Sequence, residues 1–221
     1  MYNLKQISLF RSLTDSEFDE LYSGSKEVVF TKKEMIIKHG SMPLAVAYVS
    51  EGLVKMYDEY PGNRKHILHI IKSNEFIDVF SVFSDLPYHF SASALLDTKV
   101  VMFERNVIIN IASRNPVFAS NTLRYLSVLS VFLLRNVIDL YRKNLKGRIA
   151  FLLLFLSRDV FSSDHFALPL SRQEIADFSS MSRENISRTL NEFHKEGIIN
   201  IDNDTIQILN EVLLEKISDF G

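Results

Sequence analysis

The chain has 221 residues and a mass of 25.5 kDa, and it is 47% hydrophobic and 24% charged, which is ordinary for one large or two small globular domains. Seventeen Phe and eight Tyr supply a core and exclude an intrinsically disordered chain. The net charge of −2 excludes a strongly basic, histone-like coat. Because cysteine is absent, disulfides, thiol nucleophiles and cysteine-ligated zinc or iron–sulfur clusters are excluded.

Neither a signal peptide nor a membrane span is predicted. The first residues lack the basic head, apolar run and small-residue cleavage site of a signal peptide. The most apolar run, Ile149–Leu156, covers about eight residues, whereas a bilayer span needs roughly 20. We therefore expect a cytoplasmic protein with no membrane partner.

The N-terminal half predicts a short helix followed by a β domain. Residues 4–23 have helical spacing, with Thr14–Glu17 as the start signal. From Glu27 to Glu104, β-forming runs alternate with turn-like residues. The predicted strands are Val28–Phe30, Met35–Lys38, Ala45–Val49, Leu53–Tyr57, Lys65–Ile71, Ala92–Leu96 and Lys99–Phe103. This spacing predicts a small antiparallel barrel or sandwich.

A long apolar helix is predicted next. The run Val117–Tyr141 repeats apolar residues at three- and four-residue spacing without Gly or Pro. Its polar residues are too few to cover it, so we expect it to pack on the β domain and on a second copy of itself. The expected dimer-interface residues are Leu123, Leu126, Leu129, Phe132, Leu133, Val137 and Leu140.

A helix-turn-helix pattern occupies Leu170–Gly197. Ser171 and Glu174 form a capping box, and Ser182 caps the second helix. The residues predicted to face inward are Ile175, Ala176, Phe178, Ile186, Leu190 and Phe193. Ser180 in the turn is expected to take a left-handed backbone at a cost of about 1 kcal/mol. Residues 198–208 predict a hairpin, and thus a wing behind the two helices.

The outward face of the second helix has the side chains that read base edges. These are Arg183, Glu184, Ser187 and Arg188. Arg donates two hydrogen bonds to guanine and Glu accepts from cytosine, so this set favours DNA binding over a plain packing unit. The expected phosphate contacts are Ser171, Arg172, Gln173, Ser182 and Asn185.

Bulk charge does not favour DNA. Residues 143–221 contain nine Lys+Arg against twelve Asp+Glu, a net charge of −3. We therefore expect DNA binding to rely on a local basic face. Its expected members are Lys143, Lys146, Arg148, Arg172, Arg183 and Arg188.

Over nearly its whole length the chain resembles the Crp/Fnr family of bacterial transcription regulators. The resemblance rests on the order of segments, on Ser182-Arg183-Glu184 with Arg188, on Lys146–Ala150 and on Asn74–Asp78. It implies an α+β fold: an N-terminal β-roll, which is a jelly roll like that of cyclic-nucleotide-binding domains, a long dimerisation helix and a C-terminal winged helix-turn-helix. The expected domain ranges are 1–114, 115–142 and 143–221.

The resemblance also implies a function. A homodimer would bind a palindrome in double-stranded DNA, and Glu184 and Arg188 would read a shared G·C pair in TGA-containing half-sites. Arg183 would add a further G, as in TGTGA. In activating relatives the region that corresponds to Phe161–Phe166 contacts RNA polymerase, which makes that enzyme a further expected partner.

The effector site departs from the family pattern. The Gly-Glu and Arg-Ser pairs that hold cyclic AMP in relatives are replaced by Asp78-Val79 and Phe90-Ser91. A phosphate would lose its arginine and lie near a carboxylate, so cyclic AMP is not expected to bind. The expected pocket-lining residues are Phe76, Val79, Phe80, Phe90, Ser91, Leu133 and Leu134.

Three alternatives stay open for this pocket: no ligand, an apolar ligand, or haem with His89 as the candidate axial ligand. No cofactor and no other metal site is predicted. An enzyme is not expected, because the chain has no Gly-rich phosphate loop, G-x-S-x-G or H-E-x-x-H motif. A dimeric sensor or scaffold that has lost DNA binding is the remaining rival.

Overall fold

The fold is taken from a computed structural model that describes residues 7–60 and 64–221. The side chains at positions 8, 64, 136 and 139–141 also lie outside the description. Three sequence predictions therefore fall partly outside the described residues: the start of the N-terminal helix, the turn at 61–63 and the side chain of Leu140.

Within its described residues, 7–23, the N-terminal helical segment contains two separate helices rather than a continuous one. A short 3-10 helix, η2, covers Ser8–Phe10, and α1 covers Asp15–Ser23. Thr14 accepts a hydrogen bond from the Glu17 N–H while Glu17 accepts from the Thr14 N–H, which completes the predicted start signal. Because this capping box starts a new helix at Thr14, the apolar residues before it lie in a separate turn.

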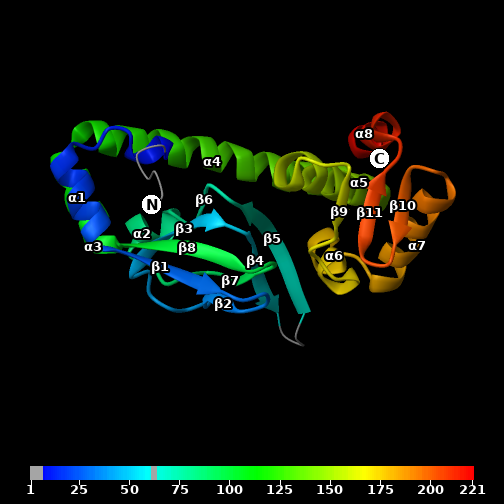
Figure 1. The fold of residues 1–221 in the computed structure, drawn as a ribbon, viewed down its shortest axis with the longest axis horizontal. Coiled ribbons are helices and arrows are strands. Elements are labelled where there is room, and N and C mark those ends of the chain that lie inside the picture. The colour runs from blue at the N-terminus through cyan, green and yellow to red at the C-terminus, as the bar shows by residue number, and fades with distance from the viewer. Residues whose placement is uncertain (1–6, 61–63) are drawn as a thin grey trace. The chain divides into compact units, whose positions relative to one another are not determined.

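Two four-stranded sheets form the β-roll (Figure 1). One sheet has the order β1-β8-β3-β6 and contains Ser25–Phe30, Thr98–Glu104, Ala45–Glu51 and Glu75–Ile77. The other has the order β2-β7-β4-β5 and contains Met35–Ile37, Ser91–Ala94, Leu53–Tyr60 and Arg64–Lys72. All seven predicted strands are present, and β6 is an additional one that follows the Lys72–Asn74 turn.

The core is built from two hydrophobic layers. Between the sheets, small and branched residues such as Val49, Val54, Ala92 and Val100 are almost completely buried. On the other face of the β1-β8-β3-β6 sheet lies an aromatic cluster. In this cluster the Phe10 ring packs against Phe103, Phe76 and Phe118, with centroid distances of 5.1, 5.8 and 6.4 Å.

Helices follow β6 and the last strand of the roll. The short helix α2 covers Phe80–Ser84, α3 covers Arg105–Arg114, and α4 covers Pro116–Arg142, as predicted. Asn115 ends α3 and starts α4, because its side-chain oxygen accepts a hydrogen bond of 2.9 Å from the Phe118 N–H. Phe118 is fully buried, which fixes the first turns of α4 on the roll.

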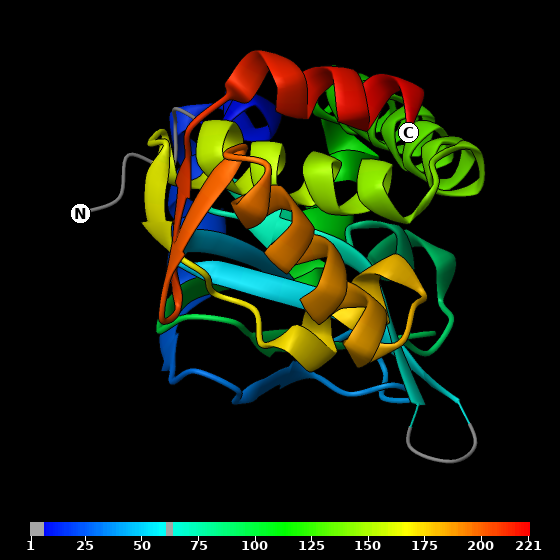
Figure 2. The same ribbon diagram turned by 90° about the vertical axis from the view of Figure 1, so that its right-hand side faces the viewer.

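The C-terminal part has the predicted winged helix-turn-helix (Figure 2). The helix α5 covers Leu145–Phe155 and continues as a π-helix over Leu156–Phe161. The strand β9, His165–Ala167, joins the predicted wing strands β10, Ile199–Asp202, and β11, Thr205–Ile208, in the order β10-β11-β9. The helix-turn-helix consists of α6, Arg172–Ser179, and α7, Arg183–Lys195, and α8 covers Glu211–Phe220.

Gly147 explains how closely α5 and α8 pack. A Cβ atom at this position would lie 2.8 Å from the carbonyl oxygen of Gly221. Only a residue without a side chain therefore allows this approach. By compactness the chain divides between Leu133 and Leu134, and the segment Tyr60–Ile67 groups with the second unit.

A comparison of Gly52 with Gly40 distinguishes the cost of backbone strain from the cost of a steric clash. Both have positive φ, +106° and +79°, but a Cβ at Gly52 would lie 2.4 Å from Thr98 Oγ1, whereas nothing lies within 4 Å of one at Gly40. We expect Gly40→Ala to cost about 1 kcal/mol, from backbone strain alone. We expect Gly52→Ala to cost a further 1–3 kcal/mol or so from overpacking. Urea unfolding of both variants measures this, and equal losses would contradict the clash.

Candidate nucleic-acid interface and ligand cavity

The start of α6 is fixed by a capping box. Ser171 Oγ accepts from the Glu174 N–H at 3.2 Å, and Glu174 Oε2 accepts from the Ser171 N–H at 2.8 Å. Ile175, Ala176 and Phe178 are buried on its inner side, as predicted. The cap leaves Ser171 and Gln173 exposed at the start of the helix. Gln173 Nε2 also donates to Asp177 Oδ1 at 2.8 Å.

The turn between α6 and α7 has the left-handed residue that the sequence predicts. Ser180 has φ of 57° and ψ of 42°, and the Met181 N–H donates to the Ala176 carbonyl at 3.0 Å. Ser182 Oγ then accepts from the Asn185 N–H at 3.3 Å and starts α7. The turn therefore sets where the second helix begins.

The outward face of α7 has the predicted base-reading set. Arg183, Glu184 and Arg188 are exposed and Ser187 is half-buried, while Ile186, Leu190 and Phe193 are buried on the other side. Arg188 Nη2 donates to Asn185 Oδ1 at 2.9 Å, so these two side chains are positioned together. The first two turns of α7 thus present two guanidinium groups and one carboxylate to solvent.

Arg172 differs from the other predicted phosphate contacts. Its side chain is half-buried, and burial lowers the pKa of its guanidinium while the charge of Asp204 in the wing raises it. Its Nη1 atom is buried with no hydrogen-bond partner among the described residues. The Arg172 side chain is therefore partly shielded from solvent, and the charge of Asp204 in the wing acts on it.

Three members of the expected basic face are engaged inside the domain. Lys146 Nζ lies 3.0 Å from Glu192 Oε2, and Lys143 Nζ donates to the Ser218 carbonyl. Arg148 donates to the carbonyl oxygens of Ser179 at 2.7 Å and Lys143 at 3.0 Å. These contacts connect the start of α5 to α6, α7 and α8. The expectation that all six cations form one basic face is therefore wrong for these three residues. The exposed cations that remain from that set are Arg183 and Arg188.

A cavity of about 510 Å³ lies between the β-roll and the inner face of α4. Its lining consists of Met56, His69, Ile71, Asn74, Glu75, Phe76, Asp78, Phe80, Ser81, His89, Phe90, Tyr125, Val128, Leu129, Phe132 and Leu133. Four of the seven predicted pocket residues are among them: Phe76, Phe80, Phe90 and Leu133.

Three predicted pocket residues lie elsewhere. Val79 is buried in the aromatic core cluster, and Ser91 is buried on β7, where its Oγ accepts from the His39 N–H at 3.1 Å. Leu134 is exposed. The reason is geometric, because neighbours on a strand face opposite ways and neighbours on a helix are about 100° apart. Ser91 is therefore buried in the β-roll, while the preceding Phe90 lines the cavity.

Sequence reasoning missed several lining residues that strand and helix periodicity could have found. His69 and Ile71 are two apart on β5, and Tyr125, Leu129 and Phe132 follow four- and three-residue spacing on α4. The His69 ring meets Phe132 edge-on, with centroids 5.5 Å apart. The expected haem ligand, His89, also lines the cavity and is exposed.

Burial controls the titratable groups around the cavity. It lowers the pKa of His69 to about 4, so this imidazole is neutral at neutral pH. Burial raises the pKa of Asp78, although hydrogen bonds from Ser81 and Phe80 and the charge of His89 oppose the rise. The pKa of Tyr125 rises to about 12, mainly through burial and also through the nearby Glu75.

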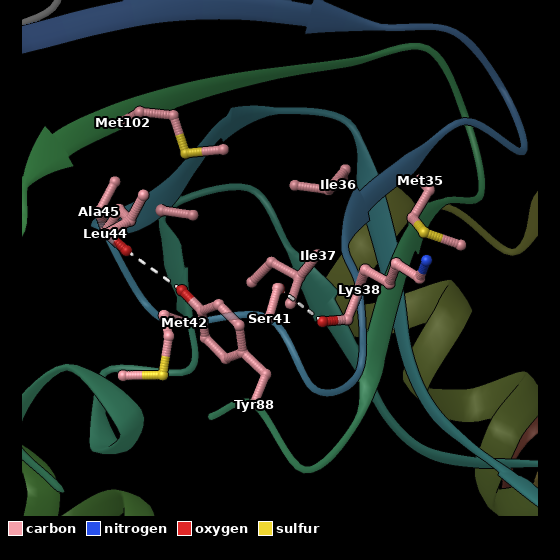
Figure 3. Close-up of a pocket in the computed structure, with 11 residues that line it drawn as sticks. Met35, Ile36, Ile37, Lys38, Ser41, Met42, Leu44, Ala45, Tyr88 and Met102 are labelled. Atoms are coloured by element: carbon pink, nitrogen blue, oxygen red, sulfur yellow. Dashed lines mark hydrogen bonds between the residues drawn. The ribbon is translucent and has the colours of Figure 1, made fainter. Parts of the chain in front are cut away.

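A second hollow of about 350 Å³ opens at the outer edge of the β-roll (Figure 3). Met35, Met42 and Met102 surround it, and Lys38 is its one charged lining residue. Its polar groups are satisfied within the roll, since Tyr88 Oη donates to the Ala45 carbonyl at 3.2 Å and Ser41 Oγ to the Lys38 carbonyl at 2.6 Å.

Comparison with known proteins gives two family matches. Residues 27–115 match the cyclic nucleotide-binding domain, and residues 147–217 match the Crp-like helix-turn-helix domain. The matches cover the β-roll with α3 and the C-terminal part with its wing. Their order along the chain is the order in which the fold places these two parts.

Curated relatives match over nearly the whole length. The cyclic AMP receptor protein of Thermus thermophilus is 25% identical over 99% of this chain and 99% of its own. The nitrogen fixation regulation protein FixK of Bradyrhizobium diazoefficiens is 24% identical over 94% of this chain and 88% of its own.

Solved structures agree with the fold. The structure of FixK2 from Bradyrhizobium japonicum has a TM-score of 0.77 and 25% identity, covering 89% of this chain and 98% of that one. A putative regulator of the Crp/Fnr family from Eubacterium rectale has a TM-score of 0.80 and 17% identity, covering 95% and 97%. With both domain families matched in order, the chain belongs to the Crp/Fnr family of transcription regulators.

Proposed function

We propose that this protein is a cytoplasmic, sequence-specific regulator that binds palindromic DNA as a homodimer and does not respond to cyclic AMP. The observation that carries the proposal is the exposed set Arg183, Glu184 and Arg188 on the first two turns of α7. Bidentate Arg–guanine contacts and a Glu–cytosine contact from such a helix read a G·C-containing half-site. We infer half-sites that contain TGA.

The exposed side of α4 supports the dimer. Val128, Val131, Leu134 and Ile138 are all exposed at three- and four-residue spacing. Among the described residues, one helical segment, Pro116–Arg135, is long and apolar enough to cross a membrane. Only 11% of its most apolar 18-residue stretch is buried inside the protein. Pairing of two such helices would remove this apolar surface from water.

The side of α4 that we assign to the dimer interface, here called the seam, differs from the predicted interface. Leu126 packs against the aromatic core cluster, and Leu129 and Leu133 line the cavity. Of the predicted interface residues, Leu123, Phe132 and Val137 are exposed. We therefore place the seam on the side of α4 that contains Val131 and Leu134. A two-fold dimer would set its α7 helices on half-sites about 34–36 Å apart.

The lining of the cavity argues against cyclic AMP. Its described residues include Asp78 and Glu75 but no Lys or Arg. Burying a phosphate without a cationic partner costs several kcal/mol, and the carboxylates would add repulsion. The binding of cyclic AMP is a property of the relatives named for it, and the cavity residues here do not supply that chemistry.

The loop 161–166 is the proposed contact with RNA polymerase. The rings of Phe161 and Phe166 stack with centroids 5.3 Å apart, which ties the two ends of the loop together. Ser162, Asp164 and His165 are exposed between them. The contact would therefore use these polar side chains rather than the two Phe rings.

Selection from random duplex DNA at fixed salt, without added ligand, tests the sequence preference. We expect enrichment of a palindrome with TGA in each half-site. On the selected site Arg188→Ala should weaken binding by about 1–3 kcal/mol and relax the preference at one base pair. Lys195→Ala is the control, because Lys195 is exposed in the last turn of the same helix. Equal binding by both variants would instead favour a scaffold that has lost DNA binding.

The oligomeric state tests the α4 seam. We expect a mass of twice 25.5 kDa for the native chain in sedimentation equilibrium. Val131→Lys should shift the sample to monomer, because it buries an unpaired charge in the seam. Asn110→Lys adds the same charge at an exposed position of α3 and should remain dimeric. A native monomer, or a dimer that tolerates Val131→Lys, would refute this seam.

Cyclic AMP should change neither thermal stability nor DNA affinity. A ligand at 100 times its Kd stabilises a protein by about 2.7 kcal/mol, so a melting curve with millimolar cyclic AMP is a sensitive assay. An upward shift of the melting temperature would overturn the proposal. A haem absorbance band in the purified protein would favour the haem alternative, with His69 or His89 as its candidate ligand.

A further inference from the structure

The cavity beside α4 has aromatic walls. Rings from four parts of the fold line it: Phe76 from β6, Phe80 from α2, Phe90 from the loop before β7, and Tyr125 and Phe132 from α4. The face of an aromatic ring has a partial negative charge, so several rings around one space favour a cation or an apolar group over an anion.

The formal charges around the cavity have the same sign. Its described lining includes two carboxylates, Asp78 and Glu75, and no Lys or Arg. His69 does not compensate them, because its imidazole is neutral at neutral pH. His89 also acts on Asp78, but it is exposed, where water screens its charge.

Asp78 is held in place. Its backbone is left-handed, with φ of 46°, and its side chain is more than nine-tenths buried. Oδ1 accepts from the Ser81 N–H at 3.2 Å, and Oδ2 accepts from the Ser81 hydroxyl. Glu75 is also tied down, because its Oε2 accepts from the Lys72 N–H at 3.1 Å. The Asp78 carboxylate is thus preorganised and retains lone pairs for another donor.

We propose that this cavity binds an organic ammonium ligand with an apolar body, whose charged head group meets the carboxylates while its body packs among the rings. The inference rests on the proposed function, because it takes this cavity to be an effector site of the proposed DNA-binding regulator. A carboxylate or phosphate ligand is disfavoured by the same groups. A neutral ligand would keep the apolar contacts but would not supply a positive charge to the Asp78 carboxylate.

Three probes that differ only in head-group charge test the proposal. They are 4-phenylbutylamine, 4-phenylbutan-1-ol and 4-phenylbutyrate, titrated calorimetrically into the full chain. We expect the amine to bind at least about tenfold more tightly than the alcohol, a difference of about 1.4 kcal/mol, and the acid not to bind. Equal affinities of amine and alcohol, tighter binding of the acid, or no binding of the amine would overturn it.

Asp78→Asn identifies the carboxylate that makes the difference. Asn tolerates a left-handed backbone and can still accept from Ser81, so the loop should fold. We expect the preference for amine over alcohol to fall to about twofold or less. Asp85→Asn is the control, because it removes a carboxylate from the same loop region, paired with Arg105 outside the cavity lining. A preference that survives Asp78→Asn would overturn the role of Asp78.

Phe90→Arg is the reverse test, because it adds a cation to the cavity wall. We expect it to reduce amine binding at least about tenfold and to allow 4-phenylbutyrate to bind. DNA binding by the same preparations separates the two proposals. A protein that binds its selected site but not the amine overturns the ligand alone, whereas loss of specific DNA binding in the native protein overturns the proposed function.

Discussion

The helix α4 packs on the β-roll, lines the cavity and presents an apolar side to solvent, and much of this fold depends on how its residues divide among these three roles. Its first turns are fixed by Asn115 and by the fully buried Phe118, next to Phe10 and Phe103. Farther along the same side, Leu129 and Phe132 line the cavity. The remaining side, with Val131 and Leu134, is exposed in a single chain. A ligand in the cavity would therefore contact the helix on which we place the dimer seam.

The C-terminal part shows how an acidic domain can present a cationic reading surface. Half of the predicted basic face is used internally, since Lys143 donates to Ser218, Lys146 pairs with Glu192 and Arg148 donates to Ser179. These contacts neutralise acids and fix helix ends at the same time. Because they withdraw those cations from the surface, Arg183 and Arg188 on α7 stand out as the exposed positive groups of that set. Specific contacts rather than bulk charge would then dominate DNA binding.

The cavity keeps the position of a family ligand site and changes its chemistry. The pair Asp78-Val79 replaces Gly-Glu, and Asp78 now points its buried carboxylate toward Ser81 and the cavity. By the family resemblance Phe90 stands where an arginine is expected, and it adds a ring to an aromatic wall. With the ammonium ligand that we propose, these two departures would replace a site suited to an anion by one suited to a cation.

The sequence by itself determined the order of the elements and the exposed face of α7. Capping boxes at Thr14 and Ser171, the left-handed Ser180 and the periodicity of α4 are local signals, and each depends on residues within a few positions of one another. Burial of Ile186, Leu190 and Phe193 then fixed which side of α7 faces outward. This is why the exposed positions of Arg183, Glu184 and Arg188 were predictable.

Only the tertiary structure decided which distant residues meet. His69 and Phe132 lie on a strand and a helix that are far apart in the chain, and no local pattern indicates that their rings touch. The same holds for Lys146 and Glu192, and for the placing of Val79 in the core rather than in the cavity. Such pairings depend on how elements pack, so residue type and spacing alone could not assign them.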